Sequence, residues 1–113
     1  MERLLTLEDI EFRSKHNILD WCDISYNQKL SENVIIQFQD KVDWKGISYQ
    51  QNLSEDFIRE FQDKIDWHIL GYNELKLSDE FILEFIDKLN LESMLRYQKL
   101  TPEIREYMNL LIG

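Results

Sequence analysis

The stretch "DWKGISYQQNLSEDFIREFQDKI", residues 43–65, decides the fold because the chain repeats it with small changes on either side. Residues 20–42 read "DWCDISYNQKLSENVIIQFQDKV", and residues 66–89 read "DWHILGYNELKLSDEFILEFIDKL". The tryptophans near the start of these copies are 23 residues apart, and a looser copy over residues 90–113 has Leu91 in their place. A fixed period of this length is typical of stacked supersecondary units.

Each copy contains two signals for the start of a helix. An Asp or Asn precedes the Trp or Leu, where its side chain can cap a first helix of about two turns. A Leu-Ser or Leu-Thr pair, followed within two residues by an acid, then predicts a second helix, because hydroxyl groups cap helices and acids favour the positive end of the helix dipole. The first caps are Asp20, Asp43, Asp66 and Asn90, and the second caps are Ser31, Ser54, Ser78 and Thr101. We therefore expect four helix pairs.

Apolar residues four apart follow each second cap, as in Phe57, Phe61 and Ile65. This spacing places them on one face of a helix, and it predicts second helices of about 12 residues, or roughly 18 Å. Before the first copy, Thr6 and Asp9 have the spacing of a capping box, which predicts a cap helix. No segment alternates apolar and polar residues as a half-buried strand would.

We therefore predict an all-α fold, a short right-handed α-solenoid of about four short-helix/long-helix hairpins of about 23 residues, preceded by an N-terminal cap helix. One hairpin cannot bury its apolar stripe alone, so the Trp, Ile and Phe side chains are expected to pack between neighbouring hairpins. The outward positions are then free to vary. As a domain division, we expect a single helical-repeat domain over residues 1–113, with a cap (1–19), three repeats (20–42, 43–65 and 66–89) and a divergent C-terminal repeat (90–113).

The repeated unit resembles a degenerate tryptophan-containing helical repeat that occurs in tandem in proteins of giant viruses, of phages and of some bacteria. The residues that carry the resemblance follow the pattern "DW..IS..Q.LSE.FI.EF.DK". The resemblance is close over residues 20–89 and loose over residues 90–113. It implies a helical-repeat framework, and it carries over no enzymatic activity and no binding residue.

The composition indicates a soluble globular protein with a strong negative charge. Of the 113 residues, 43% are hydrophobic and 31% are charged, and the formal net charge is -9. This charge argues against direct binding to nucleic acid or to an anionic membrane surface. No apolar run of about 18 residues is present, and the first residues lack the cleavage site of a secretory signal. The only cysteine, Cys22, cannot form an internal disulfide, so we expect a cytoplasmic location and a Cys22 side chain buried as a small hydrophobe.

The sequence contains none of the motifs that bind phosphate or activate a serine nucleophile. Its two histidines, His16 and His68, have no cysteine or acid at the spacing of metal ligands. His68 occupies a position that holds Cys22, Lys45 and Glu92 in the other copies, which is typical of a solvent-exposed position. We therefore expect no enzymatic activity, no cofactor and no metal.

The first functional hypothesis is a noncatalytic module that binds another protein through outward positions. Extra apolar residues on the second helices, where other copies have polar residues, form either a partner-binding patch or a wider core seam: Ile36, Leu83 and Ile86. Tyrosines five residues after each Trp either form a binding ridge or pack over the hairpin loops: Tyr26, Tyr49 and Tyr72. Counting from Leu91, Arg96 takes this position in the last copy.

A second hypothesis starts from the carboxylates of the second helices. An array of negative charge on a rigid scaffold can imitate a phosphate backbone, as in a small acidic phage or viral inhibitor of the anti-CRISPR kind that blocks a basic site on a host nuclease. Acids that merely compensate helix dipoles are the ordinary alternative. The candidate acids are Glu55, Asp56, Glu60, Asp63, Asp79, Glu80, Glu84 and Asp87. A third hypothesis is a self-associating scaffold, such as a homodimer, formed through the Leu83 and Ile86 face.

Overall fold

The computed structural model describes residues 3–113, and this part of the chain contains nine helices and no named strand. The predicted all-α fold is confirmed. The helices are α1 (Leu7–Lys15), α2 (Trp21–Asn27), α3 (Glu32–Gln37), α4 (Trp44–Gln50), α5 (Glu55–Glu60), α6 (Trp67–Leu70), α7 (Asp79–Glu84), α8 (Leu91–Tyr97) and α9 (Pro102–Ile112). Among the described residues, no helix has both the length and the apolar character needed to cross a bilayer.

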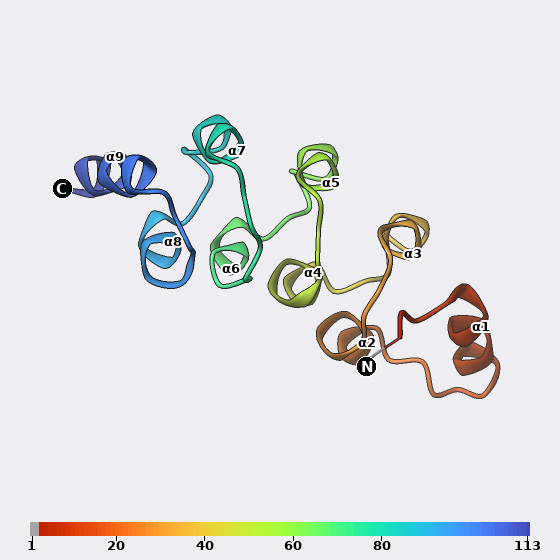
Figure 1. Cartoon of the computed structure of the whole chain (residues 1–113). Coiled ribbons are helices and arrows are strands. Elements are labelled where there is room, and N and C mark those ends of the chain that lie inside the picture. Colours follow the sequence, from red (N-terminus) through yellow and green to blue (C-terminus); the bar gives the residue numbers. More distant parts are fainter. Residues whose placement is uncertain (1–2) are drawn as a thin grey trace.

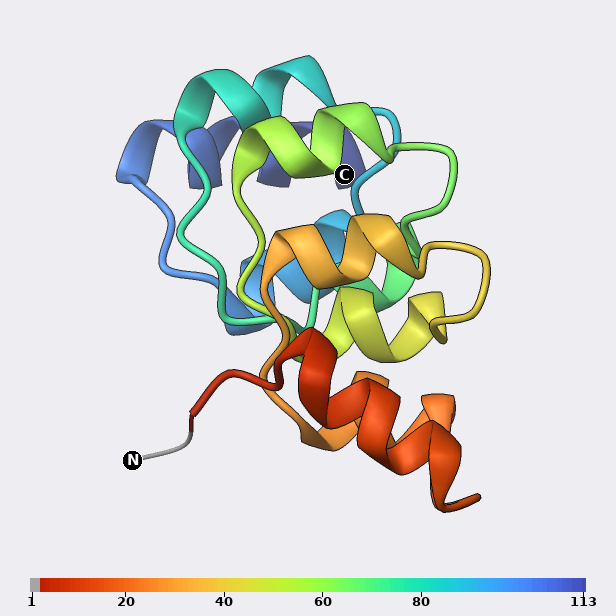
Figure 2. The ribbon, with the colours of Figure 1, turned by 90° about the vertical axis from the view of Figure 1, so that its right-hand side faces the viewer.

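After α1, the helices alternate between two rows (Figure 1). We call α2, α4, α6 and α8 the first row, and α3, α5, α7 and α9 the second row. The view from the α1 end shows the helices of each row lying one behind another (Figure 2). In the first row, α2 packs against α4 and α4 packs against α6. The molecule is elongated as a result, with extents of 53 × 28 × 19 Å.

The helices begin where the capping residues predict. Asp20 accepts hydrogen bonds from the backbone amides of Cys22 and Asp23, and the Ser54 hydroxyl accepts one from Phe57 at 3.1 Å. The other predicted caps act in the same way, each at the first turn of its helix. These starts follow from the sequence because a cap bonds an amide only two or three residues away.

The predicted capping box of α1 is also present. The Thr6 hydroxyl accepts from the amide of Asp9, and the Asp9 carboxylate accepts from the amide of Thr6 at 2.9 Å. Arg3 donates to the same carboxylate at 2.7 Å. These bonds, that of Arg3 first, hold the pKa of Asp9 well below its usual range. The segment before α1 is joined to the body by the amide of Leu5, which donates to the carbonyl of Lys29.

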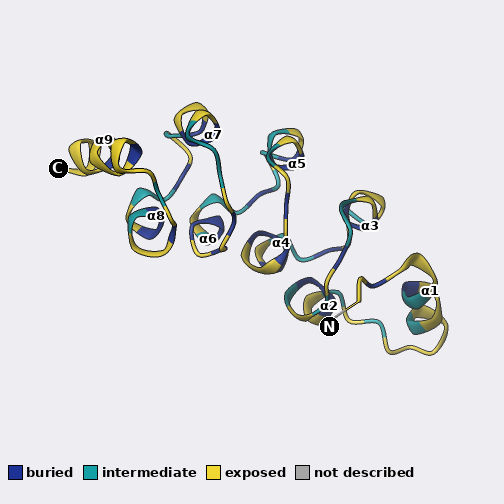
Figure 3. Ribbon diagram, in the orientation of Figure 1, coloured by how far each residue is buried: buried dark blue, intermediate teal, exposed yellow. Residues whose placement is uncertain are grey.

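The core lies between the two rows, whose facing sides are buried while their outward sides are exposed (Figure 3). Branched residues of both rows are fully buried, among them Ile24 and Ile47 in the first row and Ile35 and Ile58 in the second. The tryptophans are only partly buried against this core. Each packs against the phenylalanine that directly follows the next helix, with ring centroids 5.0 Å apart for Trp21–Phe38, 5.7 Å for Trp44–Phe61 and 5.1 Å for Trp67–Phe85. The first pair is tilted, and the other two are stacked.

The prediction of long second helices is wrong for three of the four helix pairs. Helices α3, α5 and α7 have six residues each, and only α9, with 11, approaches the expected length. The chain leaves α5 at Phe61 and makes a separate turn in which Lys64 and Ile65 donate to the Phe61 carbonyl. Ile65 is still buried, so the four-residue spacing of apolar residues is kept after the helix has ended.

The turns after α3 and α5 are each stabilised by the indole of the tryptophan that begins the next helix. The indole of Trp67 donates to the carbonyl of Gln62 at 2.9 Å, and the indole of Trp44 donates to the carbonyl of Gln39 at the same distance. These carbonyls are free for the indoles because the helix has stopped before them. The indole bonds stabilise the turns after α3 and α5, and α7 ends at the equivalent residue although the helix after it begins with Leu91.

Candidate functional site

Four tyrosines lie in line along the first row, one for each helix pair. The rings of Tyr26 and Tyr49 meet edge to face with centroids 6.4 Å apart, and those of Tyr72 and Tyr97 lie 5.2 Å apart. Tyr49 and Tyr72 line one open cavity of about 350 Å³ between the two pairs. We call this set, Tyr26, Tyr49, Tyr72 and Tyr97, the tyrosine row.

The fourth member, Tyr97, is not the residue that the sequence repeat aligns with the other three tyrosines, which is Arg96. Arg96 is the sixth residue of α8, as Tyr26 and Tyr49 are of α2 and α4. Tyr97 is the next residue, and the structure places it against Tyr72, which lies beyond the end of the four-residue α6. The signal that could have identified Tyr97 was the presence of a second aromatic residue directly beside Arg96.

The tyrosine row is accessible from outside the protein. Tyr49, Tyr72 and Tyr97 are 43%, 38% and 52% exposed, and Tyr26 is half-buried. Burial, together with the nearby charge of Asp43, raises the pKa of the Tyr26 hydroxyl above its ordinary value. The row therefore presents aromatic area and polar tips side by side.

Small residues beneath the row bring its helices close together. A Cβ atom on Gly46 would lie 2.8 Å from Cδ2 of Tyr26 and 2.9 Å from Cβ of Ser25. A Cβ atom on Gly71 would lie 2.7 Å from Cβ of Ser93. Neither position has room for a side chain, so glycine at these two places sets the close approach that lines up the rings.

Buried amide side chains also join neighbouring helix pairs under the row. The side chain of Gln51 donates to the carbonyls of Ser25 and Gln28 at 3.0 and 2.7 Å, and its oxygen accepts from the amide of Leu30 at 2.9 Å. Asn73 and Gln98 repeat the arrangement, each donating to the carbonyl of the preceding amide residue. We call Gln51, Asn73 and Gln98 the amide ladder, and all three are buried.

The amide ladder was not predicted, because the segments that contain it were interpreted as polar connectors between helices. A signal was present in the sequence. An amide residue follows the Trp or Leu of each copy by six or seven positions, at Gln28, Gln51, Asn73 and Gln98. If the connectors only needed to be polar, the residue type at this position would vary between copies. The repeated amide therefore indicated a specific hydrogen-bonding role.

The structure does not gather the predicted apolar candidates. Ile36 and Leu83 are 36% and 49% exposed, but they lie on α3 and α7, with α5 between them (Figure 1). At the equivalent position of α5, Arg59 donates to Glu84 at 3.0 Å. Ile86 is partly buried and packs against the core. The three residues therefore form no continuous surface.

The eight candidate acids divide into two groups. Four of them make bonds within the protein: Glu55 and Asp79 accept from the cap residues Ser78 and Thr101, and Asp56 and Glu84 accept from Arg59. The other four have neither an ion pair nor a side-chain hydrogen bond among the described residues: Glu60, Asp63, Glu80 and Asp87. The free acids are thus half of the set that the sequence suggested.

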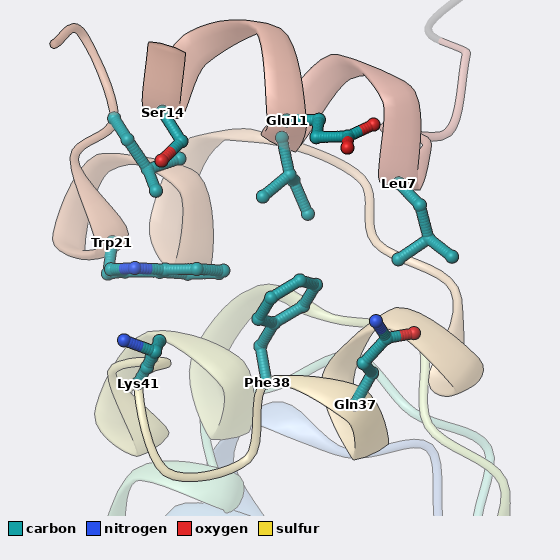
Figure 4. A pocket seen from close by; sticks show the side chains of 9 residues that line it. Leu7, Glu11, Ser14, Trp21, Gln37, Phe38 and Lys41 are labelled. Carbon is teal, nitrogen blue, oxygen red and sulfur yellow. The ribbon is translucent and has the colours of Figure 1, made fainter.

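A cavity of about 410 Å³ lies at the other end of the molecule, between α1 and the first helix pair (Figure 4). Trp21 and Phe38 lie against each other along one side of it, and Leu7 and Glu11 reach toward it from α1. Trp21 donates no hydrogen bond to residues 3–113, unlike Trp44 and Trp67. The lining is apolar with polar groups at the rim, and it provides no set of groups that would select one class of ligand.

A smaller pocket, of about 100 Å³, lies between the end of α6 and α8, within the tyrosine row. We call it the α6–α8 pocket. Its lining residues are His68, Tyr72, Asn90, Glu92, Ser93, Arg96 and Tyr97. His68 is exposed, as predicted, but it is not unconstrained. Its Nδ1 lies 2.7 Å from the side-chain nitrogen of Asn90, and its ring meets Tyr72 edge to face with centroids 5.8 Å apart.

The prediction that Cys22 is a buried hydrophobe is wrong, because the structure places it on the exposed side of α2. Partial desolvation and then the charge of Asp43 raise the pKa of its thiol. The other copies have Lys45, His68 and Glu92 at this position, and all three are exposed. The sequence therefore contained the signal for an outward position, and the general preference of cysteine for the interior was the wrong guide.

No family model, no curated protein and no solved structure matches this chain. Within residues 3–113, no three His, Cys, Asp or Glu side chains converge in a way that would hold a metal ion. The candidate site therefore rests on its geometry, which is a row of exposed tyrosines held by close helix contacts and by buried amides.

Proposed function

We propose that this chain is a noncatalytic, cytoplasmic protein-interaction module, a short α-solenoid of about four helix pairs with an N-terminal cap, which binds another protein through the tyrosine row. The observation that carries the proposal is the continuity of the row. Its rings are partly exposed, and neighbouring rings either touch or share a cavity.

Tyrosine is suited to such a surface. It offers a large apolar ring and a polar tip while restricting only two side-chain torsions on binding, which is why it is enriched at binding hot spots. The rings of Tyr26 and Tyr49 already touch before any partner arrives. A surface that is ordered in advance loses less conformational entropy when it binds.

The charges near the row favour a basic partner. The N-cap residues Asp43 and Asp66 lie close enough to Tyr26 to influence its hydroxyl. The first-row helices and their caps carry more carboxylates than cations: Asp20, Asp23, Asp43, Asp66 and Glu92 against Lys45 and Arg96. Together with the net charge of -9, this favours association with a positively charged protein surface.

The test uses affinity capture from the native host with three forms of the protein: wild type, Tyr49→Ala and Tyr107→Ala. Tyr107 is a matched control because it is also 43% exposed but lies on α9, outside the row. We expect the same specific partner to be retained by the wild type and by Tyr107→Ala, and to be lost from Tyr49→Ala. For the purified pair, calorimetry should show binding about thirtyfold weaker for Tyr49→Ala, as for a typical hot-spot residue.

Partner retention that is equal in all three forms would reject the tyrosine row as the binding surface. Thermal unfolding of each variant serves as the control for loss of the fold. We expect all three forms to have similar melting temperatures, because an exposed tyrosine contributes little to the core. The acidic-inhibitor alternative has weaker support, since half of its carboxylates are already engaged by Ser78, Thr101 and Arg59. The self-association alternative, through the Leu83 and Ile86 face, has weaker support because Ile86 is partly buried against the core, which leaves Leu83 as the exposed member of that face.

A further inference from the structure

Three of the residues that line the open α6–α8 pocket carry aromatic rings: His68, Tyr72 and Tyr97. The planes of His68 and Tyr72 are inclined at 68°, and those of Tyr72 and Tyr97 at 45°. Neighbouring rings are therefore not stacked in parallel. Aromatic faces carry negative potential, so a group of rings around a small space can attract a cation.

A hydrogen-bond network positions the His68 ring. The Asn90 side-chain oxygen accepts from the backbone amide of Ser93 at 3.2 Å, so its nitrogen is the atom that faces His68 Nδ1 at 2.7 Å. An amide nitrogen donates, so Nδ1 is the acceptor of this contact. The contact fixes the orientation of the imidazole beside Tyr72.

The α6–α8 pocket is small, with a volume of about 100 Å³. An ammonium group is compact, whereas a guanidinium is planar and binds best when stacked flat on a ring or clamped in a bidentate manner. Rings inclined at 45° and 68° cannot hold a planar group between two parallel faces. The small volume and the inclined rings therefore favour the compact ammonium group.

Two charged residues line the rim of the pocket, Glu92 and Arg96. The Glu92 carboxylate is the counter-ion that an incoming cation requires. Arg96 has no ion pair among the described residues, and its positive charge opposes such a cation. The net charge of -9 on the whole chain adds a general attraction for cations.

We propose that the α6–α8 pocket binds the ε-ammonium group, plain or methylated, of a lysine side chain of the partner protein. The inference rests on the proposed function, since it names one anchor of the partner bound by the tyrosine row. Two independent observations support it: a cavity lined by three aromatic rings, and a carboxylate at its rim.

The test uses small probes and the intact chain. Backbone amide shifts are followed by NMR during titration with Nα-acetyl-lysine methylamide and with its trimethylated form, at constant ionic strength. The matched neutral probe is Nα-acetyl-norleucine methylamide, which keeps the aliphatic chain but lacks the charge. We expect saturable shifts at Tyr72, Glu92 and Tyr97 with both lysine probes, and none with the norleucine probe.

Single substitutions then test which residues bind the lysine probe and whether negative charge at the pocket favours binding. Tyr97→Leu and Glu92→Gln should each weaken lysine binding by about fivefold, in line with the loss of an exposed cation–π or ionic contact. Arg96→Gln should strengthen it, because it removes the opposing charge. Tyr107→Leu, on α9, should leave binding unchanged.

Three outcomes would overturn the proposal: equal shifts with the norleucine probe, tighter binding of the corresponding arginine probe, or weaker lysine binding in Arg96→Gln. Because Tyr49 does not line this pocket, its capture experiment reports on the tyrosine row alone. Failure of the lysine site therefore leaves that result unchanged, and failure of the row leaves the probe titration interpretable.

Discussion

Neighbouring helices are linked by one kind of hydrogen bond within the first row and by another kind within the second row. Along the first row, the links are the buried side-chain amides of the amide ladder, which bond backbone carbonyls of the preceding connector. Along the second row, carboxylates of one helix accept from the cap residue of the next, as Glu32 does from Ser54 and Glu55 from Ser78. The side chain of Glu55 is 28% exposed, so water reaches the second kind of link.

This difference indicates how the molecule divides its roles. A buried bond that is broken leaves unpaired polar groups away from water, whereas an exposed bond that is broken is replaced by water. The first row is therefore held in one arrangement, and it is the row that carries the tyrosines. The second row can vary at lower cost. Removing links one at a time from each row tests this contrast.

The largest effect is expected from Gln51→Ala. The substitution leaves the buried amide of Leu30 and the carbonyls of Ser25 and Gln28 without their partner. We expect the free energy of unfolding to fall by about 3 kcal/mol. Urea denaturation followed by circular dichroism measures it.

The control is Gln50→Ala, the neighbouring residue, which is exposed and has the same chemistry. This substitution should change the free energy of unfolding by no more than about 0.5 kcal/mol. Equal losses for the two variants would remove the distinction between buried and exposed links.

The second-largest effect is expected from Gly71→Ala, which tests the close contact between the end of α6 and α8. Gly71→Ala places a Cβ atom 2.7 Å from that of Ser93, which should cost about 2 kcal/mol of unfolding free energy. Removing the other Cβ in the double variant Gly71→Ala/Ser93→Gly should recover part of the loss. A double-mutant cycle from thermal unfolding measures the coupling, and purely additive effects would contradict a direct clash.

A third comparison concerns the indole bonds that join a first-row helix to the turn before it. Trp44→Phe removes the hydrogen bond to the Gln39 carbonyl and should cost about 1 kcal/mol more than Trp21→Phe. Trp21 is the natural reference, because its indole donates to no group within residues 3–113. If urea denaturation gave equal losses of unfolding free energy for Trp44→Phe and Trp21→Phe, the indole bond would add nothing beyond ring packing.

The smallest effect is expected in the second row. Glu55→Ala removes the acceptor of Ser78, but water can replace it, so the loss should be about 1 kcal/mol. Glu60→Ala, on the same helix, should cause almost no change, because Glu60 is exposed and has no side-chain bond in the described part of the chain. A Glu55→Ala loss as large as that of Gln51→Ala would show that the two rows do not differ.

The helix starts were predictable because each depends on a cap that lies within a few residues, such as Ser54 and Phe57. Three members of the tyrosine row were predictable for a similar reason, since each follows the Trp of its copy by five residues. Tyr97 was missed because the repeat aligns Arg96 with them, and only the packing of the helices brings Tyr97 against Tyr72. The amide ladder was missed because glutamine and asparagine are usually surface residues, and only the carbonyls of the preceding connector make their burial favourable.

The sequence by itself determined the period, the all-helical character, the start of each predicted helix and the apolar stripe of the second helices, such as Phe57, Phe61 and Ile65. These features depend on groups within one or two helical turns, where chain connectivity fixes which groups meet. The tertiary structure decided where the second helices end, which amides are buried and which tyrosines touch. Those outcomes depend on the neighbouring helix pair, as when Gln51 bonds Ser25, 26 residues away, or Gln98 bonds Gly71, 27 residues away. Such a bond is favourable only where the helix pairs pack together and exclude water from between them.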